Sequence, residues 1–417
     1  MISKVIPKDV VVVEDELRHD EVVRFIKECG YERTPLILNV EGKRVAKNFI
    51  STRDRLCRYL GVSRENLTPY LASVKMVKDL DILDFGKLEE VGFRERKITL
   101  EELPILKYYP KDGGRYITAG VVIAPFNEHC NACIHRMMLI DKRRLVARLV
   151  KPRHTYLLWE KAVRSGRDLK IAVAIGVHPL VLFASATRVP EGMEFHYAKA
   201  LLRNLRLYRA WYDEKLLIPP AEIVLFGRIT ADLAEEGPFV DLTGTYDSIR
   251  EQPVIEIDEV WSVDDPIYYS ITPASSEHQV LMGIPYEPLI YKSVSNVCKA
   301  KNVVMSEGGL RYFHAFVQIE KHSEGDGKNA IMAAFAAHHS LKHVVVVDDD
   351  IDIFNPLEVE YAIATRLQGD RDIVIIKGAR GSSLDPSSIG GTTTKVGFDA
   401  TKDISRKDDF ERVVSCI

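Results

Sequence analysis

Tyr116-Ile117-Thr118-Ala119-Gly120-Val121-Val122-Ile123 is the stretch that decides the fold of the middle of this chain. It is rich in β-branched and aromatic residues, and two similar runs follow it at 169–177 and 222–226, separated by proline and glycine. Short β-rich runs between turn residues are typical of a β-barrel or sandwich. We therefore predict that the region from residue 101 to about 290 is built mainly from strands.

The chain before this region mixes helices with strands. Residues 20–29 and 52–60 have the pattern of amphipathic helices, and they end at Gly30 and Gly61. Glycine just after the last periodic residue is a common helix stop. The run 36–38 is predicted to be a strand.

After about residue 300 the pattern changes again. Predicted helices at 328–341 and 356–366 alternate with predicted strands at 343–347 and 373–377. Such alternation indicates an α/β layer with parallel strand pairing. The sequence thus predicts an α/β chain (α+β in its multi-domain arrangement). Its expected parts are an N-terminal α/β domain (1–100), a central β domain (101–295) and a C-terminal α/β domain (296–417).

The bulk properties place limits on location and partners. A formal net charge of −3 argues against a nucleic-acid binder, and six cysteines in 417 residues form no disulfide framework. The longest apolar stretch, 171–186, is broken by Gly176, His178 and Pro179, so we expect two buried strands around a turn rather than a membrane span. No apolar signal-peptide core stands at the start. We expect a cytoplasmic protein that binds neither membrane nor nucleic acid.

Cys130 and Cys133 form a CxxC pair inside the ligand-rich segment 129–136. A zinc site normally needs a second pair of ligands, and a redox CxxC normally opens a helix after a strand. Neither context is visible, so small buried thiols remain the alternative.

His154 and Glu194 each have an ordinary structural interpretation. His154 follows the apolar run 145–150, and a histidine there is more often structural than a metal ligand. Glu194 precedes a predicted helix, where the helix dipole favours an acid.

Two acidic segments are further candidates. Glu236 and Asp241 flank the Gly237-Pro238 turn, which lets both carboxylates converge, although a solvated acidic loop is the alternative. Asp348 and Asp350 follow a buried strand, at the sheet edge where α/β proteins bind ligands. Their spacing resembles the DxD cation site of nucleotide-sugar glycosyltransferases, and helix-capping acids are the alternative.

Seven segments together resemble the UbiD family of decarboxylases in order and spacing, from about residue 100 to 401. They are 131–136, Lys151-Pro152-Arg153-His154, Pro190-x-Gly192-x-Glu194, 220–225, Glu236-Gly237-Pro238-Phe239, 348–353 and 395–401. The resemblance implies an N-terminal α/β domain, a central split β-barrel that binds flavin, and a C-terminal α/β domain.

The resemblance also implies the cofactors and their ligands. Asn131, His154 and Glu194 would hold Mn²⁺, a set that suits a borderline-hard divalent ion. The metal would fix the phosphate of prenylated FMN, and Cys133, Ile134, Arg136 and Arg153 would contact that cofactor. Backbone carbonyls at 184–187 would hold K⁺.

By the same resemblance, Arg136, Glu236 and Asp241 would be the catalytic triad, with Asp241 as proton donor. Glu236 would favour a proton on Asp241, and Arg136 would oppose it. Four departures stand out: Arg153 where the family often has glutamine, Leu225-Phe226-Gly227, an aspartate at 241, and Cys133-Ile134-His135 before the arginine. None removes a proposed ligand or triad member.

The activity implied is reversible decarboxylation of an α,β-unsaturated acid, with cofactor supplied by a separate flavin prenyltransferase and a homo-oligomeric state. The chain is compact, poor in glutamine and rich in charge, like family members of the archaeal mevalonate pathway. This predicts trans-anhydromevalonate 5-phosphate as substrate and isopentenyl phosphate as product, with Arg153 as a candidate phosphate ligand. The alternative is an aromatic acid such as 4-hydroxy-3-polyprenylbenzoate.

Overall fold

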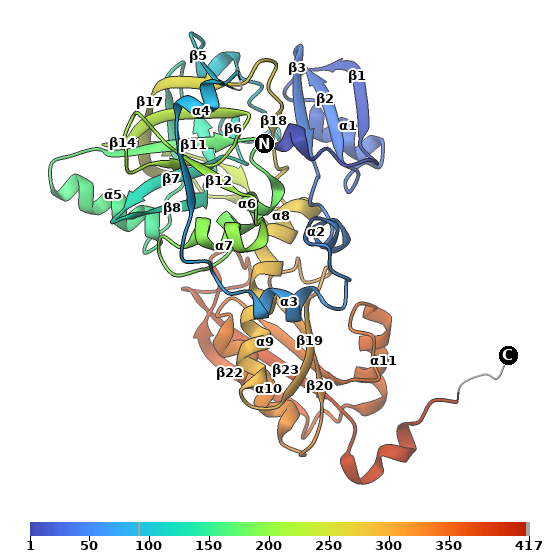
Figure 1. Cartoon of the computed structure of the whole chain (residues 1–417). Coiled ribbons are helices and arrows are strands. Elements are labelled where there is room, and N and C mark those ends of the chain that lie inside the picture. The colour runs from blue at the N-terminus through green and yellow to red at the C-terminus, as the bar shows by residue number, and fades with distance from the viewer. Residues whose placement is uncertain (91, 414–417) are drawn as a thin grey trace. The chain divides into compact units, whose positions relative to one another are not determined.

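The computed structural model describes residues 1–90 and 92–413 (Figure 1). The chain divides into two compact units: residues 1–61 with 74–281, and residues 62–73 with the chain from Met282 onward. Each unit combines sheets with helices, so the predicted mixed α/β class is confirmed. The predicted boundaries at residues 100 and 295 stay a prediction.

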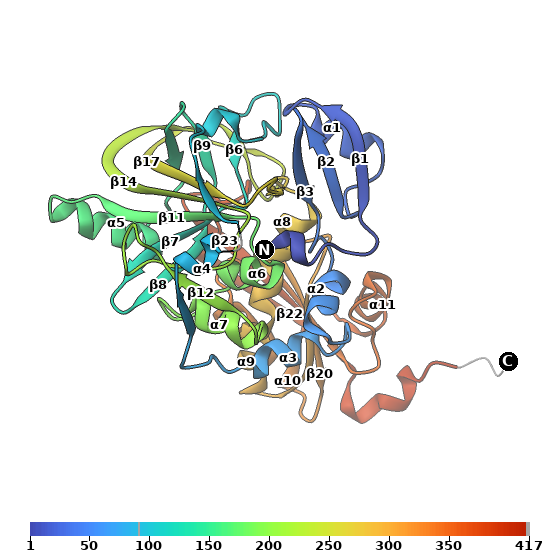
Figure 2. The same ribbon diagram turned by 45° about the horizontal axis from the view of Figure 1, so that its top comes forward.

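The first unit is built around a nine-stranded sheet of antiparallel pairs. Its strand order is β6-β9-β10-β17-β14-β11-β7-β8, with β5 also paired to β17. The strands are β5 (Arg94–Arg96), β6 (Tyr116–Ile117), β7 (Val121–Phe126), β8 (His129–Ile134), β9 (Met137–Leu139), β10 (Arg144–Ala147), β11 (Leu169–Ile175), β14 (Ile223–Glu236) and β17 (Arg250–Ser262). This sheet is the predicted central β region, and Figure 2 shows its long strands β14 and β17 running together.

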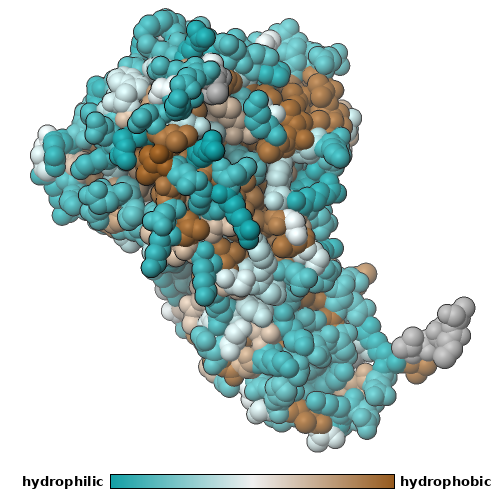
Figure 3. Space-filling view, viewed as in Figure 1, coloured by the Kyte–Doolittle hydropathy of each residue, from teal (hydrophilic) through white to brown (hydrophobic). Residues whose placement is uncertain are grey.

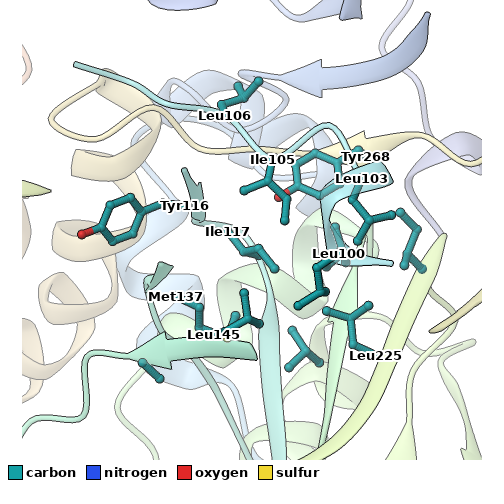
Figure 4. Packing of buried hydrophobic residues seen from close by; sticks show 14 of the residues in the cluster. Leu100, Leu103, Ile105, Leu106, Tyr116, Ile117, Met137, Leu145, Leu225 and Tyr268 are labelled. Carbon is teal, nitrogen blue, oxygen red and sulfur yellow. The ribbon is translucent and has the colours of Figure 1, made fainter. Parts of the chain in front are cut away.

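The core of this unit fills one side of the sheet. Figure 4 shows Ile117, Met137 and Leu145 from the strands packed with Leu100 and Ile105 from the segment before them. All five side chains are almost fully buried. Removal of this apolar surface from water is the main stabilising contribution to the sheet.

A smaller sheet, β1-β2-β3-β18, belongs to the same unit. Its strands are β1 (Val11–Leu17), β2 (Leu36–Val40), β3 (Lys43–Lys47) and β18 (Tyr268–Tyr269), and its helices are α1 (Val22–Glu28) and α2 (Arg53–Leu60). The Thr52 hydroxyl caps α2 by accepting from the amide of Arg55 at 3.2 Å, and Gly61 ends it at φ +68°. The two N-terminal helices and the strand at 36–38 are therefore confirmed.

The apolar stretch 171–186 corrects one prediction. Only its first part is a strand, because Pro179–Ala186 forms the buried helix α6. Pro179 occupies the first turn, where a missing N–H costs nothing, and His178 Nδ1 accepts from the amide of Leu180 at 3.1 Å. A fully apolar run has no periodicity that separates strand from helix, so the second predicted strand was wrong.

Shorter elements complete the first unit. They are η1 (Ile2–Lys4), β4 (Asp81–Asp84), α4 (Gly86–Glu89), η2 (Leu100–Glu102), α5 (His154–Arg164), α7 (Glu194–Leu201), β12 (Arg206–Arg209), β13 (Leu217–Ile218), β15 (Phe239–Val240), β16 (Tyr246–Asp247) and α8 (Ser276–Gly283), of which α8 runs to the start of the second unit. β15 and β16 form a hairpin of their own.

The second unit contains one five-stranded sheet, ordered β19-β20-β21-β23-β22. Its elements are β19 (Lys299–Met305), β20 (His314–Glu320), β21 (His343–Asp348), β22 (Ile373–Arg380), β23 (Thr392–Ala400), α3 (Leu67–Ser73), η3 (Ile284–Tyr286), α9 (Glu287–Ser295), α10 (Asp326–Ala337), α11 (Pro356–Arg366) and η4 (Ile404–Phe410). The parallel pairing predicted here is found for β20, β21 and β23, whereas β19 and β22 are antiparallel edges.

Helices cover both faces of this second sheet. Val345 and Val347 pack with Val359 and Ala362 of α11. On the other face, a Cβ at Gly397 would lie 2.2 Å from Ile331 of α10. A strand buried on both faces explains why β21 has a continuous apolar run.

The face in Figure 3 is largely hydrophilic, with separate hydrophobic patches. Among the described residues, no helix has the length and apolar character needed to cross a membrane.

Candidate active site

Arg136 lies at the centre of a cluster of carboxylates in the first unit. Its Nε and Nη2 donate to the two oxygens of Glu236 at 2.8 and 2.9 Å, and its Nη1 donates to Asp241 Oδ2 at 3.0 Å. The three residues predicted as a triad therefore meet. Glu236 is fully buried, whereas the Asp241 side chain is 21% exposed.

The local fold explains this convergence. Glu236 ends β14, the chain turns at Gly237 with φ +104°, and β15 and β16 bring Asp241 back over the arginine. The ring of Phe239 lies 4.8 Å from the Arg136 guanidinium carbon and packs beneath the charge. The solvated acidic loop, which was the alternative, is not what forms.

Asp247 is a third carboxylate on Arg136 that the sequence did not reveal. Its Oδ2 accepts from Arg136 Nη2 at 3.0 Å, and Arg250 Nη1 lies 2.6 Å from its Oδ1. It comes from β16, so only the hairpin pairing of β15 with β16 brings it to the site.

His278, on α8, is a second residue that the sequence analysis missed. Burial lowers the pKa of its ring, Asp241 acts to raise it and Arg136 to lower it, so the ring lies within electrostatic reach of the triad. The backbone amide of Ala274 donates to its Nδ1 at 3.1 Å. The neutral ring therefore carries its proton on Nε2.

The three predicted metal ligands come together at a second place in this unit. Asn131 is on β8, His154 begins α5 and Glu194 begins α7, and His154 Nδ1 lies 3.8 Å from Glu194 Oε1. Asn131 Oδ1 and Glu194 Oε2 are buried and have no hydrogen-bond partner among the described residues. Burial raises the pKa of Glu194 to about 8.

Such unpaired buried oxygens are costly unless a cation or donor satisfies them. An amide oxygen, a carboxylate and an imidazole suit a borderline-hard divalent ion. The residues thus fit the manganese that the family resemblance implies, with Asn131 held from its other side by its Nδ2, which donates to Thr155 Oγ1 at 3.1 Å.

The two cysteines of the CxxC pair point to different surroundings. Cys130 donates to the Lys215 carbonyl at 3.0 Å, whereas Cys133 lies 2.9 Å from Thr155 Oγ1 and 3.0 Å from His135 Nε2. Among the described residues, no group of three His, Cys, Asp or Glu side chains gathers as a metal site would need. A zinc site on this pair is therefore not supported.

The remaining residues predicted to contact cofactor or K⁺ belong to the same unit. Ile134 ends β8, and exposed Arg153 precedes α5. Residues 184–187 lie at the end of α6, where the Ala184 carbonyl accepts from the amide of Thr187 at 3.0 Å.

Asp348 and Asp350, in the second unit, are paired with cations of the chain itself. Arg366 Nη1 donates to Asp348 at 2.8 Å, its Nη2 donates to Asp350 at 2.8 Å, and Lys402 Nζ lies 2.7 Å from Asp350. Carboxylates paired in this way fit a structural role, which weighs against the glycosyltransferase alternative.

Comparison with known proteins gives the family. The Rift-related domain of 3-octaprenyl-4-hydroxybenzoate carboxy-lyase, UbiD, matches residues 84–276, and the C-terminal domain of the same carboxy-lyase matches residues 279–400. The chain belongs to the UbiD family of decarboxylases. The predicted family and the predicted carboxy-lyase activity are thereby confirmed.

UbiD relatives are similar along nearly the whole chain. The anhydromevalonate phosphate decarboxylase of Archaeoglobus fulgidus is 57% identical over 97% of this chain and 93% of its own length. The UbiD-class enzyme HmfF from Pelotomaculum thermopropionicum, solved in complex with FMN, matches with a TM-score of 0.92 and 36% identity over 98% of this chain and 94% of that one. An evolved dimeric form of HmfF in complex with prenylated FMN (prFMN) matches with a TM-score of 0.87 and 33% identity over the same shares.

Proposed function

We propose that this UbiD-family enzyme converts trans-anhydromevalonate 5-phosphate to isopentenyl phosphate and CO₂. The observation that carries the proposal is the 57% identity to an anhydromevalonate phosphate decarboxylase over 97% of the chain. The cluster around Arg136 supports it, because an unsaturated acid needs a cation for its carboxylate and a proton donor for the carbon that loses CO₂.

In this proposal the cofactor is prenylated FMN, which supplies the electron sink for loss of CO₂ when it is bound. Asn131, His154 and Glu194 would hold Mn²⁺, which would supply positive charge for the cofactor phosphate, and the unpaired oxygens of Asn131 and Glu194 support that role. Cys133, Ile134 and Arg153 line the cofactor, and carbonyls at 184–187 hold K⁺.

The triad residues have distinct tasks. Arg136 orients the substrate carboxylate through charge-assisted hydrogen bonds. Glu236, buried against two arginine nitrogens, fixes the guanidinium. Asp241 delivers a proton to the carbon that has lost CO₂, and it regains one from solvent through its exposed edge.

The experiment offers holo-enzyme two acids, trans-anhydromevalonate 5-phosphate and 4-hydroxy-3-polyprenylbenzoate, and measures CO₂ release from each. We expect release from the first acid only, with apo-protein inactive towards both. Release from the aromatic acid alone would reject the substrate assignment and leave the family assignment intact.

The proposal also covers partners and location. A separate flavin prenyltransferase supplies the cofactor, and the enzyme works in the cytoplasm as a homo-oligomer, at least a dimer. Exposed apolar side chains of the second unit support self-association, notably Leu357, Ile375 and Ile389 at 72%, 59% and 84% exposure. Light scattering that shows only monomer would contradict it.

A further inference from the structure

Strand pairing places a row of charged residues beside the triad. Met137 of β9 faces Ala147 of β10, and the amide of Arg148 donates to the Arg136 carbonyl at 3.1 Å, so Arg148 stands opposite Arg136. Residues directly opposite in neighbouring strands present their side chains on one face of the sheet. Arg148 therefore shares the face that carries Arg136.

The row continues across the next two strands. Val146 of β10 faces Val254 of β17, which puts Arg148 opposite Gln252. Arg250 lies two residues along β17, on the same face, and it is paired with Glu236 of β14. Arg136 comes directly before β9 and Arg148 directly after β10, so by this register the two arginines share one face of the sheet with Arg250 and Glu236.

The hydrogen bonds in this row are unevenly shared. Arg136 bonds to Glu236, Asp241 and Asp247, and Arg250 bonds to Asp247. Among the described residues, the closest carboxylate oxygen to the Arg148 guanidinium is Asp247 Oδ2, 3.9 Å from its Nε. That separation is an ion pair without a hydrogen bond, so the guanidinium N–H donors of Arg148 make no hydrogen bond within the described chain.

Arg148 is also costly to place where it is. Its side chain is only 21% exposed. Burial lowers the pKa of its guanidinium, the like charges of Arg250 and Arg136 lower it further, and the carboxylates of Asp247 and Glu236 act to raise it. A partly buried cation beside two others is stabilised by an anion that accepts several hydrogen bonds.

We propose that Arg148, with Arg250 beside it, binds the phosphate group of the substrate. This inference rests on the proposed function, in which one small molecule carries a carboxylate and a phosphate at opposite ends of a short chain. Arg136 and Arg148 are one strand spacing apart, about 5 Å at the backbone. Their long side chains let one arginine hold the carboxylate while the other holds the phosphate.

Arg153 is the competing phosphate ligand from the sequence analysis. Its side chain is exposed ahead of α5, outside this row of strand residues. An exposed arginine gains little free energy by binding phosphate, because water already solvates both charges. A partly buried arginine with unused side-chain donors gains more from the anion. Arg148 is therefore better placed than Arg153 to bind the substrate phosphate.

The test compares wild-type holo-enzyme with Arg148→Gln, Arg148→Lys and the matched control Arg144→Gln. Arg144 begins β10, four residues before Arg148, and forms an exposed ion pair with Asp141. Binding of isopentenyl phosphate is measured by calorimetry. KM and kcat are measured for trans-anhydromevalonate 5-phosphate and for the same acid without phosphate. Manganese content and flavin absorbance report that each variant is intact.

We expect Arg148→Gln to weaken isopentenyl phosphate binding and to raise KM for the phosphorylated acid by about 10- to 100-fold, the loss of a charge-assisted contact. Turnover of the unphosphorylated acid changes less than about threefold. Arg148→Lys recovers part of the affinity, and Arg144→Gln behaves as wild type.

Equal losses with both acids would assign Arg148 a structural role and overturn the inference. Unchanged phosphate binding in Arg148→Gln, or none in the wild type, would also overturn it. Failure of the proposed function is a separate result, because it is read from the wild type alone as absence of CO₂ release from the phosphorylated acid.

Discussion

Arg136 donates two hydrogen bonds to Glu236, from Nε to Oε1 at 2.8 Å and from Nη2 to Oε2 at 2.9 Å, but only one to Asp241, at 3.0 Å. Glu236 has no exposed side-chain surface, whereas Asp241 is 21% exposed. A buried carboxylate that accepts two hydrogen bonds from one arginine is stabilised in its ionised form. Of these two carboxylates, Asp241 is therefore the one able to exchange a proton with solvent.

Asp241→Asn removes that proton and keeps the shape of the side chain. We expect kcat to fall by at least about 100-fold, the usual contribution of a general acid, with manganese and flavin content unchanged. Asp247→Asn is the matched control, since Asp247 is also bonded to Arg136. If the loss came from altered charge alone, both variants would fall equally, and near-normal turnover in Asp241→Asn would reject the assignment.

His154→Ala and Glu194→Ala should lose manganese and flavin together, because in the proposed site these side chains would hold the ion that binds the cofactor phosphate. Metal analysis and flavin absorbance of the purified variants measure both. Glu191→Ala, in the same loop and three residues before Glu194, should retain both. Full flavin occupancy without metal would contradict the bridging role.

The helices of the fold were predictable where local signals agreed. Thr52 and Gly61 mark the two ends of α2, and each acts within its own turn. The helix α6 was missed because every position of 179–185 is buried, which erases the periodic pattern. Pro179 was the local sign of a helix start, and it was interpreted as a turn.

The site shows the same division between local and long-range information. Glu236 and Asp241 could be brought together from sequence because a Gly-Pro turn lies between them. Asp247, Arg148 and His278 could not be placed from sequence. Asp247 depends on a hairpin, Arg148 on the register of β10 with β17, and His278 on the placement of α8. A register slip of one residue would turn those strand side chains to the other face.

Arg366→Leu tests the structural role of the acidic strand end in the second unit. The arginine side chain is 1% exposed and pairs with both Asp348 and Asp350. Removing one partner of a buried ion pair costs about 3–5 kcal/mol, so we expect a clearly lower Tm. Arg371→Leu should change Tm little, because the Arg371 side chain is 64% exposed and its Nε lies 3.7 Å from Asp372. Calorimetric binding of a UDP-sugar to the wild type would instead revive the transferase alternative.

His178 predicts a pH dependence of stability. Burial lowers the pKa of its ring to about 4, below the unfolded value of about 6.5, so the folded state disfavours the protonated ring. Its contribution is complete above about pH 6.5 and is lost as pH falls towards 4, a change on the order of 3 kcal/mol. His178→Asn keeps a helix cap that does not titrate. Thermal unfolding between pH 4 and 7 should show wild type losing more stability than this variant, and parallel curves would contradict the prediction.

Gly113 packs against the Gly237-Pro238 turn that joins Glu236 to Asp241, here called the acidic turn. A Cβ there would lie 2.1 Å from the Gly237 carbonyl oxygen, and the amide of Gly113 donates to the Pro238 carbonyl at 2.8 Å. Gly113→Ala must therefore push the backbone that joins Glu236 to Asp241. A displacement on the order of 1 Å misplaces catalytic groups, so we expect kcat to fall about 10- to 100-fold. Manganese and flavin should stay bound, because Asn131 and Glu194 lie outside this turn. Gly114→Ala is the matched control: its Cβ would meet Met138 Cγ at 3.1 Å, and a flexible methionine can move aside. If both variants kept full turnover, the acidic turn would tolerate displacement and the proton donor would have to lie elsewhere.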